Sequence, residues 1–166
     1  ILEVVQQTRQ SAPKTLYHLP EAPTVGTDEH DVLRAAIQGG SAYLKIADGC
    51  RRPCAFCSIP LIKGTLVSRP AETIVAEAQQ LYEMGVNELI LIAQDTTDYG
   101  HDFGLKEGLS HLLEELVAAV PDLPWIRVMY AYPGYVTDRL IDVMRDYPQI
   151  LPYLDMPLQH AHPATL

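Results

Sequence analysis

Residues 42–57 read AYLKIADGCRRPCAFC, and this stretch decides the fold. The run at residues 42–47 has the composition of a buried strand, and Cys50, Cys54 and Cys57 follow it on one short loop. They are the only cysteines among the 166 residues. Three thiolates on one loop suit an iron-sulfur cluster, because each cysteine binds one iron and a cubane with three protein ligands leaves its fourth iron open. An open iron can bind and reduce a further molecule.

Disulfides and zinc are the other common uses of such cysteines. An odd number of cysteines argues against a disulfide framework, and a redox pair of Cys54 and Cys57 leaves Cys50 unexplained. Structural zinc takes four ligands, so a distant histidine such as His18 or His160 would have to complete the site. A structural metal-binding interaction module therefore stays open as the non-enzymatic alternative.

The composition describes one globular domain with a sizeable core, since 48% of the residues are hydrophobic and 20% are charged. The formal net charge of -9 makes direct nucleic-acid binding by this segment unexpected, because phosphate contacts need clustered lysine and arginine. No apolar run reaches membrane-spanning length and no signal-peptide pattern opens the chain, so no membrane association is expected. Cysteines without disulfide partners indicate a reducing cytoplasm.

Beyond the cysteines, predicted strands alternate with predicted helices. The strands are expected at residues 42–47, 89–93, 125–131 and 153–158, and the complete helices at about residues 70–84, 109–120 and 137–147. The Leu/Ile run at residues 89–93 is typical of a parallel strand covered on both faces. Four strands with helices between them predict part of an α/β barrel, in which reactive residues collect at the carboxyl ends of the strands. The cysteine loop, Gln94-Asp95, Tyr132-Pro133 and Gln159-His160 all follow such ends.

The first of these helices has one apolar face and one polar face. Its apolar positions are Ile74, Val75, Ala78, Leu81 and Tyr82, whereas Glu72, Glu77 and Gln80 are expected on the solvated face. Pro70 suits its first turn and Gly85 its end. Thr137 is the predicted N-cap of the third helix.

Both ends of the chain appear cut, so we expect further domains. Residues 6–31 have the proline, glycine and polar composition of a linker, and a short helix is expected at residues 31–38. We therefore assign residues 1–40 to the end of a preceding domain with its linker, and residues 41–166 to the first part of a barrel.

The cysteine motif, with Phe56 as the aromatic residue before Cys57, resembles that of the radical S-adenosylmethionine (SAM) superfamily. The segments YLKIADGC (residues 43–50), SIP (58–60), KG (63–64) and SRP (68–70) are similar to the methylthiotransferases of that superfamily. IAQDTT (92–97) and MPLQH (156–160) resemble the RimO type, which modifies an aspartate of a small-subunit ribosomal protein. The resemblance covers residues 41–163 and implies a partial (β/α) barrel of the radical SAM type, truncated after its fourth strand.

The resemblance implies a methylthiotransferase that adds a methylthio group to the β-carbon of that aspartate. Cys50, Cys54 and Cys57 would hold a [4Fe-4S] cluster whose open iron chelates the amino and carboxylate groups of SAM. One electron would cleave the sulfonium, and the resulting 5'-deoxyadenosyl radical would remove hydrogen from the β-carbon. The protein would supply position and exclude water.

Four residues are expected to bind the cofactor by this resemblance: Phe56, Gln94, Asp95 and Gln159. Many radical SAM enzymes carry a Gly-Gly-Glu-like segment after the second strand, and it holds the methionine amino group. Gln94-Asp95 occupies that place without the glycines, so the role transfers by position only. No catalytic side chain is assigned.

The family also implies parts that this chain lacks. They are a preceding domain with three further cysteines for an auxiliary [4Fe-4S] cluster, and a following small β-barrel that binds substrate. The resemblance also implies a partner, a reductant protein such as flavodoxin. The nearest enzyme alternative is a tRNA-adenosine methylthiotransferase. That type shares the cysteine loop but usually carries Gly-Gln-Asn at residues 93–95 and serine at the position of His160.

Overall fold

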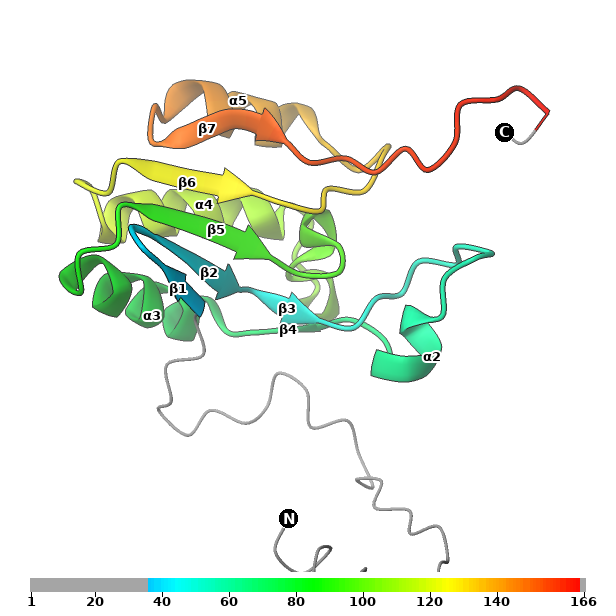
Figure 1. Ribbon diagram of the computed structural model, residues 1–166, viewed down its shortest axis with the longest axis horizontal. Coiled ribbons are helices and arrows are strands. Elements are labelled where there is room, and N and C mark those ends of the chain that lie inside the picture. Colours follow the sequence, from blue (N-terminus) through cyan, green and yellow to red (C-terminus); the bar gives the residue numbers. More distant parts are fainter. Residues whose placement is uncertain (1–35, 165–166) are drawn as a thin grey trace, which may run out of the picture.

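A five-stranded sheet organises residues 36–164, the part of the chain that the computed structural model describes (Figure 1). The sheet has the order β1-β2-β5-β6-β7. Its strands are β1 (Ala36–Gln38), β2 (Ser41–Lys45), β5 (Glu88–Ile92), β6 (Trp125–Val128) and β7 (Ile150–Leu154). The strands from β2 to β7 are parallel, and β1 pairs antiparallel with β2. The expected alternation of parallel strands and helices is confirmed.

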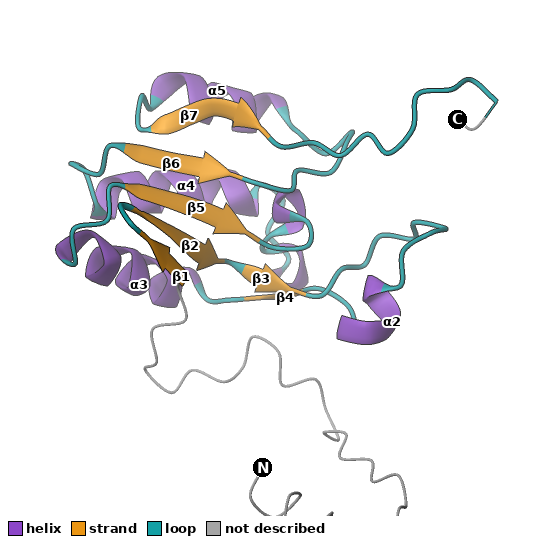
Figure 2. Cartoon of the chain, viewed as in Figure 1, coloured by secondary structure: helices purple, strands orange, loops and turns teal. Residues whose placement is uncertain are grey.

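Three helices lie along one side of this sheet (Figure 2). They are α3 (Ala71–Glu83), α4 (Gly108–Ala119) and α5 (Asp138–Asp146). The shorter elements lie beyond the carboxyl ends of β2 and β5. They are β3 (Ala47–Asp48), α2 (Ile59–Lys63), β4 (Val67–Ser68), η1 (Thr96–Asp98) and η2 (His101–Phe103). β3 pairs with β4 in a small second sheet, which carries the chain into and out of the cysteine loop.

The core lies between the large sheet and the three helices. Alternate strand residues such as Leu44, Leu89 and Leu91 are completely buried, and Ile74 and Leu113 meet them from the helices. Each such side chain contributes about 1.5–3 kcal/mol through burial. The intervening residues of β2 and β5 are only half-buried. Among residues 36–164 the helices cover one face only, so the expectation that residues 89–93 are covered on both faces is wrong.

The prediction of a helix at residues 31–38 is wrong for residues 36–38, the part of it that the structure describes. Residues 31–35 lie outside the described residues, and Ala36–Gln38 form β1. The hydrogen-bonded partners Gln38 and Ser41 leave a two-residue turn of Gly39 and Gly40, with Gly39 at a φ of 61°. A glycine with positive φ suits a tight hairpin turn, so the glycine pair reverses an extended strand.

The last two strands differ from their predicted bounds. β6 ends at Val128 rather than at residue 131, and Tyr130 then takes a φ of 59°, which extended strand backbone excludes. β7 begins at Ile150, three residues before its predicted start, and ends at Leu154. Gln159 and His160 therefore lie on exposed chain beyond the strand, rather than directly at its end.

Two positions on α3 depart from the predicted faces. Tyr82 is exposed, whereas Glu77 is buried and its Oε2 lies 2.7 Å from Nη1 of Arg69, which is also buried. A buried carboxylate needs such a partner, and the apolar pattern of one helix does not reveal a partner that lies eight positions earlier, outside that helix. On α5 the predicted cap is confirmed, because Thr137 Oγ1 accepts a hydrogen bond from the Leu140 amide at 3.2 Å.

Candidate cofactor site at the cysteine loop

The cysteine loop stands at the carboxyl end of β2, as expected for a reactive segment of an α/β barrel. Its first turn depends on Gly49, which has a φ of 71°. A Cβ at this position would lie 2.7 Å from the Thr65 carbonyl carbon and 2.9 Å from the Gly64 carbonyl oxygen. The next residue, Cys50, donates its amide to that Gly64 oxygen at 3.1 Å. The start and the end of the loop are therefore in backbone contact, which only glycine permits.

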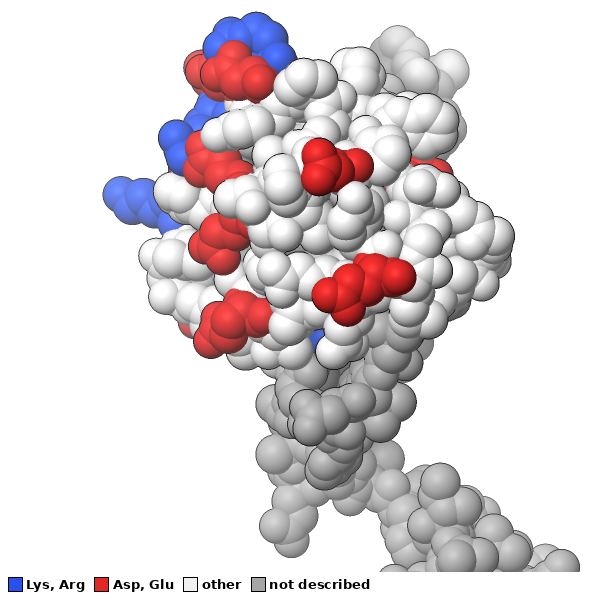
Figure 3. Space-filling model, turned by 90° about the vertical axis from the view of Figure 1, so that its left-hand side faces the viewer, with Lys and Arg blue, Asp and Glu red and all other residues white. Residues whose placement is uncertain are grey.

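The opposite end of the sheet has a different character. Figure 3 views the molecule from the amino ends of the strands, where acidic side chains are spread across the visible face and most of the visible basic side chains lie along one margin. This face of the described residues therefore presents no basic patch of the kind that phosphate backbones require.

All three cysteines line one cavity of about 340 Å³. They are free thiols, and each is half-buried. The cavity is completed by further residues of the cysteine loop and the start of α2, by residues that follow β5 and β6, and by the chain that follows β7. Those further residues are Arg52, Phe56, Ile59, Gln94, Tyr132, Pro133, Pro157, Leu158 and Gln159. Segments far apart in the sequence thus meet at the carboxyl ends of the strands, which confirms the convergence that the sequence predicted for them.

Three of the four residues predicted to bind a cofactor line this cavity: Phe56, Gln94 and Gln159. Phe56 is 70% exposed, and Gln159 lies on the exposed rim with a φ of 62°. The Oε1 atom of Gln94 is buried and has no hydrogen-bond partner within residues 36–164. A buried acceptor without a partner is costly, so this oxygen is suited to receive a donor from a bound molecule.

Asp95, the fourth predicted residue, does not line the cavity. It is 2% exposed, and its Oδ2 accepts a hydrogen bond from Nε of Arg52 at 2.6 Å. Its other oxygen accepts a hydrogen bond from the Thr97 hydroxyl at 2.5 Å. Both carboxylate oxygens are thus occupied, one by the Arg52 side chain and one by the Thr97 hydroxyl.

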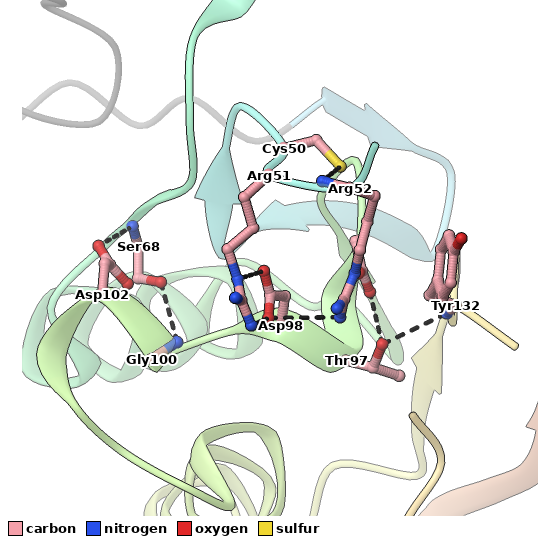
Figure 4. A network of polar contacts seen from close by, with 10 residues as sticks. Cys50, Arg51, Arg52, Ser68, Thr97, Asp98, Gly100, Asp102 and Tyr132 are labelled. Atoms are coloured by element: carbon pink, nitrogen blue, oxygen red, sulfur yellow. Dashed lines mark hydrogen bonds and ion pairs between the residues drawn. The ribbon is translucent and has the colours of Figure 1, made fainter. Parts of the chain in front are cut away.

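Both arginines of the cysteine loop are bound to the segment that follows β5. Figure 4 shows Arg51 and Arg52 reaching from the loop towards Asp98. Arg51 binds Asp98 through two hydrogen bonds of 2.6 and 2.7 Å, and Nη2 of Arg52 lies 3.3 Å from the same carboxylate. Planar bidentate pairs of this kind fix orientation as well as distance. They hold the cysteine loop against the end of β5.

Aromatic rings from the end of β6 complete the surroundings of Arg52. Its guanidinium carbon lies 3.6 Å from the ring centroid of Tyr135 and 4.9 Å from that of Tyr132. The Tyr132 hydroxyl is 3.6 Å from Sγ of Cys54. Cation-π contacts of a desolvated arginine are worth about 2 kcal/mol. Arg52 therefore joins the cysteine loop to the segments that follow β5 and β6.

The surroundings raise the pKa of the Cys50 thiol above its ordinary value. Burial is the main cause, and the negative charge of Asp95 adds to it. The backbone amide of Arg52, which donates to Cys50 Sγ at 3.4 Å, and the Arg52 cation act in the opposite direction. A bound metal ion would displace the thiol proton, because metal binding to cysteine releases protons.

The donor set fits a cluster better than a single ion. Within residues 36–164, no three His, Cys, Asp or Glu side chains converge closely enough to hold one metal ion. Zinc needs such convergence, and His160, the described histidine considered for it, lies on the exposed rim. A cubane takes one thiolate per iron, so three sulfurs around one cavity can serve it.

The chain matches the family model of the radical SAM superfamily over residues 44–166. The chain belongs to this superfamily. Among radical SAM relatives, it is 58% identical over 134 residues to "Ribosomal protein uS12 methylthiotransferase RimO" of Chloroflexus aurantiacus, and 48% identical over 165 residues to the protein of the same name in Roseiflexus castenholzii. These matches cover 81% and 99% of this chain but 30% and 34% of the relatives. The chain thus spans about a third of their length.

The radical SAM fold is also found by comparison with solved structures. The methyltransferase TsrM from Kitasatospora setae, determined with tryptophan substrate and a SAM analogue, superimposes with a TM-score of 0.59 at 18% identity. The match covers 76% of this chain and 23% of that protein. At this identity the likeness supports the fold alone, and it agrees with the partial barrel predicted from the sequence.

The link between Arg52 and Asp95 is not evident from the sequence. Signals for it were present, since two arginines stand between the first two cysteines and an aspartate follows the second barrel strand. Their partnership depends on the parallel pairing of β2 with β5, which brings residues 43 positions apart together.

None of the helices found in residues 36–164 has the length and apolar character of a membrane span.

Proposed function

We propose that the protein is a radical SAM methylthiotransferase that adds a methylthio group to the β-carbon of an aspartate in the small-subunit ribosomal protein uS12. One observation carries the proposal: a single cavity is lined by three free cysteines and by Gln94, whose Oε1 has no partner among residues 36–164. The names of the relatives support this substrate over a tRNA adenosine and over a structural metal-binding module.

Cys50, Cys54 and Cys57 would hold a [4Fe-4S] cluster in this cavity, and SAM would bind beside it. When bound, the cluster supplies the single electron that cleaves the sulfonium of SAM. Gln94 would accept a hydrogen bond from the SAM amino group through its Oε1, which is buried and has no partner among residues 36–164. Phe56 and Gln159, on the rim, would cover the bound molecule and exclude water, which protects reactive species from side reactions.

Several further parts belong to the proposal. We propose that an auxiliary [4Fe-4S] cluster lies in a preceding domain and that a reductant protein such as flavodoxin delivers electrons. Residues 1–40 would lead from that domain, and residues 41–166 would begin the barrel. Free cysteines suit a cytoplasmic setting. The net charge of -9 and the acidic face support a protein substrate rather than direct nucleic-acid binding.

The proposal is tested on the full-length protein that contains this chain. After anaerobic reconstitution, iron and sulfide are counted, and dithionite and SAM are added with detection of 5'-deoxyadenosine. A uS12 peptide is then examined by mass spectrometry for one methylthio group on aspartate. Iron uptake, cleavage and the modified aspartate together would support the proposal. Zinc binding without iron uptake, or modification of a tRNA instead, would overturn it.

Gln94→Ala tests the cavity itself. Loss of a hydrogen bond to the charged amino group corresponds to about 1.5–3 kcal/mol, so the affinity for SAM should fall about 10- to 100-fold with iron content unchanged. Gln80→Ala, an exposed glutamine on α3, is the control and should bind SAM normally.

A further inference from the structure

We propose that Arg52 is a positioning residue for the iron-sulfur site: it fixes the cysteine loop on the end of β5 and places a cation beside the cluster that raises the cluster's reduction potential. The inference rests on the proposed function, because it requires a cluster on the three cysteines. It concerns a residue that neither the sequence motif nor the relatives' names assign.

Burial separates Arg52 from an ordinary loop arginine. Its side chain is 5% exposed, and that of its partner Asp95 is 2% exposed. Arginine and aspartate are almost never buried to this extent unless they are paired. The pair is short, with 2.6 Å between Arg52 Nε and Asp95 Oδ2, and Asp98 adds a second carboxylate at 3.3 Å. The guanidinium therefore has a fixed place rather than a range of solvated positions.

That place is beside the sulfurs. Arg52 lines the same cavity as the three cysteines, and its backbone amide donates to Cys50 Sγ at 3.4 Å. On its other side, the ring of Tyr135 stacks on the guanidinium at 3.6 Å. Because side chain and amide belong to one residue, the contacts that fix the guanidinium also fix the donor to the sulfur. Hydrogen bonds to sulfur and the local charge both set cluster potentials.

Arg52 and Asp95 should shift the reduction potential of the cluster in opposite directions, because they carry opposite charges. Reduction adds one electron to the cluster, so a nearby cation stabilises the reduced form and a nearby carboxylate destabilises it. Removing the Arg52 charge should therefore lower the potential, and removing the Asp95 charge should raise it. A purely structural pair would behave differently, since breaking it from either side would loosen the same loop and change the site in the same direction.

Arg51 provides a matched control one position away. It carries the same charge, but it is 36% exposed, and within residues 36–164 Asp98 is the carboxylate that it binds. It lies against a different cavity, one that contains none of the three cysteines. Arg51→Gln therefore also removes an anchor of the cysteine loop, but solvent screens the charge that it removes, so it should change the reduction potential of the cluster little.

The experiment is an anaerobic redox titration of the full-length, cluster-loaded protein, followed by electron paramagnetic resonance, with iron counted in every sample. Arg52→Gln should make one-electron reduction at least tenfold less favourable, which corresponds to about 59 mV. Asp95→Asn should shift it in the opposite direction. Arg52→Lys, which keeps the charge, should restore most of the wild-type potential, and Arg51→Gln should shift it less than a third as far as Arg52→Gln.

Shifts of the same sign in Arg52→Gln and Asp95→Asn, or no shift in either with full iron content, would overturn the inference. If Arg52→Gln fails to load iron, the two other variants test the inference. Asp95→Asn should then have a raised reduction potential, and Arg52→Lys a potential near that of the wild type. These results leave the proposed function intact, since the wild-type protein would still load iron and cleave SAM. A wild-type protein without iron would remove both.

Discussion

Replacing Gly49 by alanine should open the cysteine loop at its first residue. The added Cβ would overlap the Thr65 carbonyl oxygen and lie 2.9 Å from the Gly64 carbonyl oxygen. Both obstacles are backbone atoms, so no side-chain rotation can relieve them. The loop must therefore move away from residues 64–65, which lie between α2 and β4, and Cys50 moves with it.

The size of this effect follows from three contributions. Alanine in the left-handed conformation costs about 1 kcal/mol relative to glycine. Loss of the hydrogen bond from Cys50 to Gly64 costs about 1 kcal/mol, and forced backbone displacement costs about 1–3 kcal/mol. We expect Gly49→Ala to lower the free energy of unfolding by about 3–5 kcal/mol, and iron uptake to fall well below that of the wild-type protein.

The assay is urea denaturation of the metal-free, full-length protein, together with iron content after reconstitution. Gly104→Ala is the control, because Gly104 has a φ of 79° but nothing within 4 Å of an added Cβ. It should show the conformational contribution alone, about 1 kcal/mol, and normal iron uptake. Equal losses of stability in the two variants, with full iron uptake in both, would refute the argument that backbone contact at Gly49 shapes the loop.

Three further predictions concern other parts of the chain. Glu77→Gln should destabilise the protein by about 2 kcal/mol in urea denaturation, because it replaces the carboxylate that lies 2.7 Å from the buried Arg69 cation by a neutral amide. Glu83→Gln, on the exposed face of the same helix, should change stability by no more than about 0.5 kcal/mol. Burial, reinforced by nearby carboxylates, raises the pKa of Tyr99, whose hydroxyl donates to the Arg69 carbonyl at 2.9 Å. Because the pKa is higher in the folded state, this group contributes its full stabilisation below the pKa of about 10 in the unfolded chain, and progressively less above it. Between about pH 9 and about pH 11, the free energy of unfolding should therefore fall more steeply for the wild type than for Tyr99→Phe. Phe56→Ala should change stability by less than about 0.5 kcal/mol, since the ring is 70% exposed, but should weaken SAM binding in calorimetry; unchanged affinity would remove Phe56 from the site.

The local features of the chain could be predicted from the sequence. The spacing of Cys50, Cys54 and Cys57, the apolar periodicity of α3 and α4, and the cap at Thr137 each depend on residues within one or two turns of one another. Such patterns specify strands, helices and a cysteine loop, and their order along the chain is enough to predict parallel strands with reactive loops at one end. Partnerships across the sheet are not local in this way.

Only the tertiary structure decided what the buried charges do. Asp95 was predicted to face a cofactor, yet it binds Arg52 across 43 positions of sequence, and Glu77 was predicted to face water, yet it is buried with Arg69. A carboxylate has the same side chain in either setting, and its role depends on which cation the fold places within hydrogen-bond distance. That placement follows from the pairing of β2 with β5 and the packing of α3, which involve the whole domain rather than any single stretch of it.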